Sequence, residues 1–252
     1  MIKDHQDAFG HLIMDYHLGK RPREVIERDD GYIDTSYGPD GYFQEYDNWS
    51  EGSKEALKLA KGRILDVGCG AGRVALHFQN AGYDIVGIDN SPLAVEVCKQ
   101  RGVKDVRLMS VTQVSRRLGP FDTIVMCGNN LALLGSRQRA KWLLRRFYSI
   151  TSKDGIIIGQ ILDPHQTTSI HHLRYHDFNT KRGRMPGQVR IRVRHQNYKS
   201  PWFDYLFLSK DELRGVIAGT GWTARQFIDQ EVAGDSGISG VYWAILCKGN
   251  GH

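Results

Sequence analysis

The sequence of 252 residues lacks the features that would mark a membrane, secreted or zinc-binding protein. No apolar run approaches the eighteen residues of a membrane span, and residues 1–7 lack the apolar core of a signal peptide. The four cysteines form no Cys-x-x-Cys pair, so reduced thiols are expected and no metal site is indicated. These absences predict a cytoplasmic protein without a membrane partner.

The charge balance is mildly basic, with a net charge of +6 and a pI near 9.1. The basic residues are spread along the chain, which favours an ordinary solvated surface over a nucleic-acid-binding tail. The length allows one α/β domain with an insertion or a small appendage. Composition therefore permits an acidic substrate or a nucleic acid and requires neither.

An apolar stretch runs into three alternating glycines, Gly68, Gly70 and Gly72, ahead of a predicted helix. Glycine tolerates backbone angles closed to other residues and lets a ligand approach the main chain. A second apolar stretch ends at Asp89, where a carboxylate can accept hydrogen bonds from a ribose diol. Arg73 occupies the third glycine position of a dinucleotide fingerprint, which disfavours a nicotinamide-dependent oxidoreductase.

The loop from Asp66 to Gly72 together with Asp89 resembles the class I methyltransferases, which bind S-adenosylmethionine. The resemblance extends over residues 63–248. It implies an α/β three-layer sandwich whose seven-stranded, mostly parallel sheet ends in an antiparallel strand. S-adenosylmethionine is the implied cofactor and S-adenosylhomocysteine the product.

Four segments are expected along the chain. Residues 1–55 form an N-terminal helical and aromatic lid segment, and residues 56–162 form the cofactor-binding half of the domain. Residues 163–208 form a substrate-side insertion, in which alternating apolar residues and arginines predict an antiparallel hairpin. Residues 209–252 supply a helix and the strands that complete the sheet.

The resemblance implies roles for individual residues. Gly68, Cys69 and Gly70 pass under the methionine part of the cofactor, and Asp66 interacts with its amino group. Asp89 takes the ribose hydroxyls. Four further positions border the nucleoside or the methionine amine, the last through its backbone carbonyl: Asn90, Ser110, Val111 and Cys127.

The N-terminal aromatic residues allow two interpretations. The side chains of Tyr37, Tyr42 and Tyr46 can close over the positively charged sulfonium, which aromatic faces attract. Alternatively, they pack as ordinary parts of the N-terminal segment. The sequence favours neither interpretation.

Candidates for the methyl-acceptor site lie after the fourth strand and on the hairpin. Asn129 and Asn130 either orient a substrate or bond the neighbouring backbone. They lack the adjacent prolines and aromatic residue of base-amine methyltransferases. Arg190 and Arg192, with Arg194 on the same face, either bind a carboxylate or phosphate or form a solvated strand face.

Several histidines follow the fifth strand, and His172 is the preferred candidate for a general base. No recognised zinc spacing is complete among them. Surface or hydrogen-bonded roles suit most of the others.

The sequence as a whole predicts methyl transfer to a small molecule by in-line displacement, with nitrogen preferred over oxygen or carbon as the acceptor atom. An RNA or protein methyltransferase remains an alternative. A non-catalytic protein that keeps the fold is another.

Overall fold

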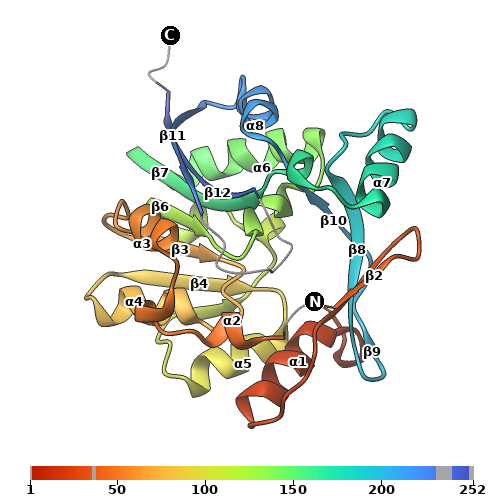
Figure 1. Cartoon of the computed structure of the whole chain (residues 1–252). Coiled ribbons are helices and arrows are strands. Elements are labelled where there is room, and N and C mark those ends of the chain that lie inside the picture. Colours follow the sequence, from red (N-terminus) through yellow and green to blue (C-terminus); the bar gives the residue numbers. More distant parts are fainter. Residues whose placement is uncertain (1, 36–37, 231–239, 250–252) are drawn as a thin grey trace. The chain divides into compact units, whose positions relative to one another are not determined.

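The computed structural model describes residues 2–35, 38–230 and 240–249 (Figure 1). The chain divides into two compact units. The first unit comprises Met1–Asn48, Leu65–Gln113 and Arg190–Phe203, and the second comprises Trp49–Ile64, Val114–Val189 and Asp204–His252. Contacts within each unit explain how its elements form.

The main sheet has seven strands in the order β11-β12-β7-β6-β3-β4-β5. Strand β12 is antiparallel to both β11 and β7, whereas β6 is parallel to β7 and β4 is parallel to β5. This order confirms the predicted mostly parallel sheet with an antiparallel last strand. The strands are β3 (Ile64–Val67), β4 (Ile85–Asp89), β5 (Val106–Leu108), β6 (Phe121–Met126), β7 (Thr151–Leu162), β11 (Trp222–Asp229) and β12 (Val241–Lys248).

In the first unit, β3 and β4 are buried along their whole length, as their continuous apolar runs predict. Helix α4 (Arg73–Asn80) begins directly after Gly72 and packs against β4. Helix α5 (Pro92–Gln100) begins with proline in its first turn, and the Ser91 side chain accepts a hydrogen bond from the Ala94 N–H. Local sequence signals therefore determine where this helix begins.

The N-terminal segment carries a 3₁₀ turn, η1 (Asp4–Gln6), and helix α1 (Ala8–His17), which packs against α5 (Figure 1). The buried Asp7 carboxylate joins the two helices. It accepts hydrogen bonds from Gly10 N–H in α1, and from the Ser91 hydroxyl and Leu93 N–H at the start of α5. A side chain at Gly10 would collide with Asp7 and Ser91, so only glycine allows this approach.

The sequence predicted an inserted antiparallel hairpin. In the structure, two N-terminal strands join this hairpin in a second antiparallel sheet. Strand β8 (Gln188–His195) pairs with β9 (Tyr198–Lys199), which confirms the antiparallel hairpin. Strand β1 (Val25–Arg28) pairs with β8 and with β2 (Ile33–Thr35). Strand β2 is exposed along its length and lies within the N-terminal helical and aromatic segment. The remaining strand of this sheet is β10 (Phe203–Leu206), next to β8.

Short helices complete the aromatic segment and the 3₁₀ turns of the chain. Their bounds are α2 (Asp40–Phe43), η2 (Tyr46–Asn48), η3 (Val111–Gln113), η4 (Arg116–Leu118), η5 (Asn130–Leu134) and η6 (Pro164–Gln166).

In the second unit, α6 (Arg137–Ile150) buries one face, as its helical period predicts, and packs against α8 (Lys210–Ile217). Helix α3 (Glu51–Leu57) packs against β11 and β12. Strand β7 contains an irregularity between Thr151 and Ile156, where its pairing with β6 shifts register. Helix α7 (Ile170–Lys181) fills the part of the insertion for which the sequence showed no clear pattern.

Candidate functional site

The glycine loop after β3 adopts the backbone that its sequence requires. Gly68, Gly70 and Gly72 have φ angles of 72°, 53° and 79°, in the left-handed region that favours glycine. A Cβ on Gly72 would lie 2.8 Å from Val103 and 3.0 Å from the Cys98 sulfur. This third glycine therefore serves close packing against the end of α5, one position earlier than a dinucleotide fingerprint would place it.

Asp89 lies at the end of β4, and its carboxylate organises the loop. One oxygen accepts the Gly70 N–H at 3.0 Å, and the other accepts the Ser91 N–H at 2.9 Å. Burial raises the pKa of Asp89, while these backbone hydrogen bonds oppose the rise. Each oxygen retains a second lone pair for a ligand hydroxyl.

Asp66 carries a buried carboxyl group within the first unit. Its side chain is buried on β3, with 2 % of the residue exposed, and its Oδ2 atom has no hydrogen-bond partner among the described residues. Burial raises its pKa to about 7, with a smaller upward effect from Asp89 and a lowering effect from Arg73. A buried carboxylate oxygen without a partner is costly, which points to a donor or cation supplied by a ligand.

The thiols beneath the loop are unsuited to nucleophilic chemistry. The sulfurs of Cys69 and Cys98 lie 3.9 Å apart, and the Cys98 thiol donates to the Gly70 carbonyl. The Cys98 contact and burial, with nearby carboxylates, raise the pKa of Cys69 well above its usual range. Cys69 thus contributes to the loop as a packed, protonated side chain.

Aromatic residues from the N-terminal segment lie over the glycine loop. A Cβ on Gly70 would be 3.7 Å from the Phe9 ring and 4.0 Å from the Tyr42 ring. These two rings meet edge to face, with centroids 5.3 Å apart. Tyr42, one of the tyrosines that the sequence suggested could close over the sulfonium, therefore lies over the loop together with Phe9, which the sequence analysis did not single out.

The other nucleoside candidates lie near Asp89. Asn90 is exposed directly after it. The Asp89 carbonyl accepts a hydrogen bond from Met109 N–H, so Ser110 and the buried Val111 lie beside the end of β4. The structure thus brings Asp66, Asp89, Ser110 and the loop together at the carboxyl ends of adjacent strands.

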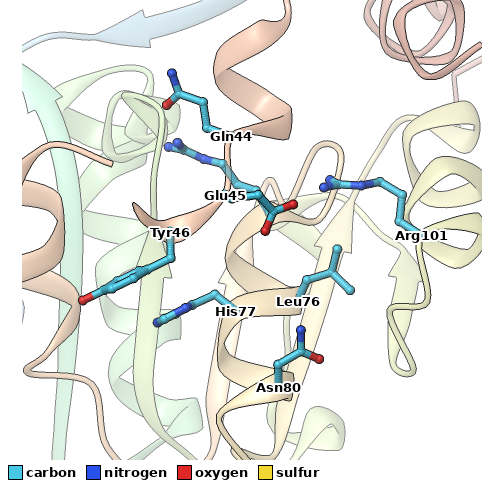
Figure 2. Close-up of a pocket in the computed structure, with 8 residues that line it drawn as sticks. Gln44, Glu45, Tyr46, Leu76, His77, Asn80 and Arg101 are labelled. Carbon is cyan, nitrogen blue, oxygen red and sulfur yellow. The ribbon is translucent and has the colours of Figure 1, made fainter. Parts of the chain in front are cut away.

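Tyr46 lies beside helix α4, and Tyr37 is outside the described residues. The Tyr46 ring stacks on His77 of α4, with centroids 4.2 Å apart. Both line a polar cavity of about 110 Å³ along α4 (Figure 2). Its lining residues are Gln44, Glu45, Tyr46, Arg73, Leu76, His77, Asn80 and Arg101.

In the second unit, the candidates after β6 form a tight turn. Cys127 is buried, and Asn129 has a φ of 64°, which is uncommon for a residue other than glycine. The Asn129 Oδ1 atom is buried and has no partner among the described residues. Asn130 lies 3.5 Å from the Tyr205 hydroxyl. The Gly128 N–H donates to the side chain of Gln160, a buried residue that the sequence analysis did not single out.

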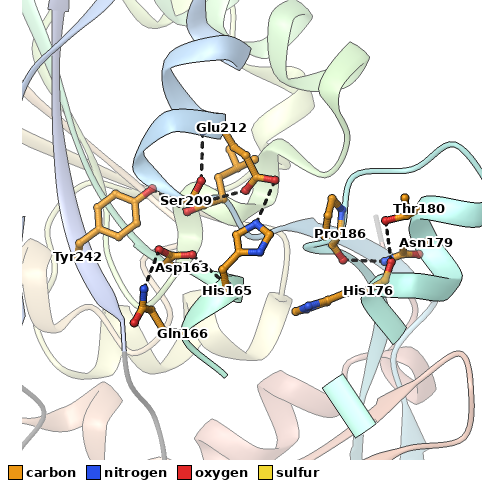
Figure 3. A network of polar contacts seen from close by, with 11 residues as sticks. Asp163, His165, Gln166, His176, Asn179, Thr180, Pro186, Ser209, Glu212 and Tyr242 are labelled. Carbon is orange, nitrogen blue, oxygen red and sulfur yellow. Dashed lines mark hydrogen bonds and ion pairs between the residues drawn. The ribbon is translucent and has the colours of Figure 1, made fainter. Parts of the chain in front are cut away.

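The histidines after β7 have local partners. His172 lies on α7, and its Nδ1 atom is 3.2 Å from the Thr167 hydroxyl. His165 lies 3.3 Å from the carboxylate of Glu212, and Figure 3 shows this contact beside the capping hydrogen bonds of Ser209 and Glu212. Within the described residues, no cluster of three or more potential metal ligands is present.

The arginines of β8 differ in their surroundings. Arg192 forms a two-point ion pair with Glu27 of β1, with both N–O distances 2.8 Å, and its guanidinium lies over the Trp202 ring. Arg194 contacts the same carboxylate at 3.2 Å, whereas Arg190 is exposed. Helices long and apolar enough to cross a membrane are absent from the described part of the chain.

Comparisons with known proteins agree with this geometry. Residues 64–155 match the family model described as a methyltransferase domain. The chain is similar to a crystal structure of an S-adenosylmethionine-dependent methyltransferase from Bacteroides fragilis in complex with S-adenosylhomocysteine. The TM-score is 0.80 at 26% identity, covering 98% of this chain and 97% of that one.

Two curated relatives are glycine/sarcosine N-methyltransferases. The protein of Aphanothece halophytica is 30% identical over 163 residues, which cover 58% of this chain and 60% of the relative. That of Halorhodospira halochloris is 28% identical over 158 residues, covering 56% of this chain and 58% of the relative. The chain thus matches less than two thirds of the length of these relatives.

Proposed function

Because the chain belongs to the class I S-adenosylmethionine-dependent methyltransferases, we propose that it transfers the cofactor's methyl group to the nitrogen atom of a small molecule. The single observation that carries this proposal is the buried, unpartnered Oδ2 atom of Asp66 beside the glycine loop. A cationic cofactor would supply the positively charged hydrogen-bond donor that this carboxylate oxygen lacks.

The residues of the first unit suit this cofactor. Asp66 would pair with the ammonium of its methionine part, and Asp89 would use its remaining lone pairs for the ribose hydroxyls. The left-handed glycines leave the loop backbone open to close approach. Ser110 and Val111 would border the adenine, and Phe9 and Tyr42 would limit the access of water to the loop.

When bound, S-adenosylmethionine supplies a methyl group on a positively charged sulfur, which is already a good leaving group. The protein then has to align the acceptor and exclude water, and such positioning can contribute effective molarities up to ~10⁵–10⁸ M. A general base is needed only where the acceptor must lose a proton before attack. His172 remains our candidate for that task.

The preference for nitrogen is supported by the names of the two glycine/sarcosine N-methyltransferases. Small amines, including amino acids, are therefore the first acceptors to test. An assay of methyl transfer should compare glycine, sarcosine and other small amines with acids and phenols, using S-adenosylhomocysteine formation as the readout. Exclusive methylation of a phenol or carboxylic acid would refute the choice of nitrogen.

Cofactor binding is tested by calorimetry. Wild-type protein should bind S-adenosylhomocysteine and should not bind NAD. Asp89→Ala should weaken this binding strongly, since charged hydrogen bonds contribute about 1.5–3 kcal/mol. The exposed Asp154→Ala serves as the matched control and should bind as the wild type does. Unchanged affinity in a folded Asp89→Ala variant would count against the proposal.

A further inference from the structure

Ser91 links two buried carboxylates at the start of α5. Its backbone N–H donates to one oxygen of Asp89 at 2.9 Å, and its hydroxyl donates to Asp7 at 2.9 Å. Asp7 is 1% exposed, Ser91 2% and Asp89 7%. All three residues lie in the first unit. A side chain of the N-terminal segment is therefore one serine away from the carboxylate proposed for the ribose hydroxyls.

The two oxygens of Asp7 have different tasks. One accepts the Gly10 N–H at 3.0 Å and caps α1, as aspartate commonly does at this position. The other accepts the Ser91 hydroxyl and, at 3.1 Å, the Leu93 N–H in the first turn of α5. The first contact stabilises α1 itself, whereas the second pair attaches α1 to the start of α5.

The Ser91 hydroxyl is held from both sides. It donates to the N-terminal segment and accepts the Ala94 N–H at 3.0 Å. Breaking such a buried contact is costly, because each group loses its partner without gaining water. Apolar packing keeps α1 in the same place, since Ile13 clusters with Ala71 and Val97. The position of Ser91 therefore depends on the docking of α1.

The orientation of the Asp89 carboxylate depends in turn on Ser91. Its two oxygens accept one backbone N–H each, from Gly70 at 3.0 Å and from Ser91. These two donors set the plane of the carboxylate. Because a hydrogen bond weakens as its angle departs from linear, a displaced Ser91 N–H would turn the plane away from a ribose diol.

We propose that Asp7 is a positioning residue: by fixing Ser91, it holds the Asp89 carboxylate in the orientation that the ribose diol of the cofactor requires. The inference rests on the proposed function. It adds that α1 contributes to cofactor recognition through this contact as well as through the Phe9 ring over Gly70. Docking of α1 and binding of the diol then stabilise each other, since the coupling between two such events is reciprocal.

The negative charge of Asp7 would by itself have the opposite effect on binding. Burial raises the pKa of Asp89, the backbone hydrogen bonds from Ser91 and Gly70 lower it, and the nearby Asp7 raises it. Removing the Asp7 charge would therefore favour the ionised Asp89, which is the stronger acceptor. Weaker binding of the diol after such a change reports lost positioning and not lost charge.

Asp7→Asn separates the two tasks of the residue. Asparagine caps helices about as well as aspartate does, so its oxygen can keep the hydrogen bond with Gly10. Its NH₂ group then faces the Leu93 N–H, which places two donors together. Helix α1 should still form, which amide exchange at Gly10 checks, while its attachment to α5 is weakened.

Calorimetry should compare S-adenosylhomocysteine with its 2′,3′-dideoxy analogue, which has no ribose hydroxyls. Asp7→Asn should weaken binding of S-adenosylhomocysteine about threefold to tenfold, because misoriented hydrogen bonds lose part of their energy. Its effect on the dideoxy analogue should be much smaller. Phe9→Ala should weaken both ligands to a similar extent, since it removes cover and not orientation. Asp4→Asn, which changes an exposed carboxylate of the same N-terminal segment, should alter neither affinity.

Equal losses for the two ligands in Asp7→Asn, or no loss for either, would overturn the inference. Ser91→Ala removes the shared hydroxyl and keeps the N–H for Asp89; it should show the same diol-specific loss and replaces Asp7→Asn if that variant does not fold. Wild-type protein that binds both ligands equally would also overturn the inference, while methyl transfer would still stand. Wild-type protein that binds no S-adenosylhomocysteine would refute the proposed function, and this inference with it.

Discussion

The Asp66 carboxylate makes the protein's stability depend on pH in a predictable direction. Its pKa rises from 3.8 to about 7 on folding, chiefly through burial. The folded protein therefore holds this proton more tightly than the unfolded chain does. The free energy of unfolding falls as the pH rises from 3.8 toward 7. Above pH 7 the full decrease, of order 4 kcal/mol, is present.

Asp66→Asn removes the titration while keeping the side-chain size. The unfolding free energy of the ligand-free variant should exceed that of the wild type at pH 8, and about 2–3 kcal/mol of the difference should develop between pH 5 and 8. Urea unfolding across this pH range measures it. Asp154→Asn, at an exposed position, should follow the wild-type curve.

The same variant should bind S-adenosylhomocysteine about 10- to 100-fold more weakly at pH 8, because a charged hydrogen bond to the ligand's ammonium is lost. Greater stability with weaker binding is the signature of a residue retained for its ligand. The reasoning would fail if the unfolding free energies of wild type and Asp66→Asn changed equally with pH and the two proteins bound S-adenosylhomocysteine equally well. The buried carboxylate would then neither lower stability nor contact the ligand.

Three further changes test the packing that supports the site, each by urea unfolding. Gly10→Ala should cost about 1–3 kcal/mol through its collision with Asp7 and Ser91, despite the better helix propensity of alanine; a more stable variant would show that α1 does not dock as described. Gly159→Ala should cost a similar ~1–3 kcal/mol, since its Cβ would lie 2.9 Å from Leu131, and an unchanged midpoint would contradict that packing. Trp222→Phe should cost about 1–3 kcal/mol through the lost packing of the indole and of the hydrogen bond that it donates to the Leu144 carbonyl, with the exposed Trp142→Phe as its neutral control.

The βα units could be predicted because their signals are local. Gly72, Ser91 and Pro92 mark helix starts through their own backbone and side-chain chemistry, and each lies within a few residues of the hydrogen bonds that it enables. Asp89 could be proposed for the ribose because it ends the second strand of the same unit. Its additional hydrogen bond to Gly70, nineteen residues earlier, was not visible from spacing alone.

The N-terminal strands could not be predicted in the same way. Strand β1 pairs with β8, and Glu27 reaches Arg192, which is 165 residues away in the chain. Nothing in a short stretch such as residues 25–28 specifies so distant a partner, since β propensity depends on the neighbouring strand. The sequence therefore indicates either anion binding or a solvated face for the arginines of β8, and only the structure shows the Glu27 carboxylate paired with Arg192.

The order of glycines, carboxylates and apolar runs indicated by itself an α/β fold with an early βαβ turn, because such a turn follows from backbone angles and the burial of neighbouring residues, and it carried the resemblance from which the cofactor was inferred. Only the tertiary structure decided that Asp66 has a buried oxygen without a partner among the described residues, that Phe9 and Tyr42 lie over Gly70, and that the Gln160 side chain accepts the Gly128 N–H. Each of these depends on side chains brought together from distant parts of the chain, and no local rule of sequence encodes which donor a buried acceptor will meet.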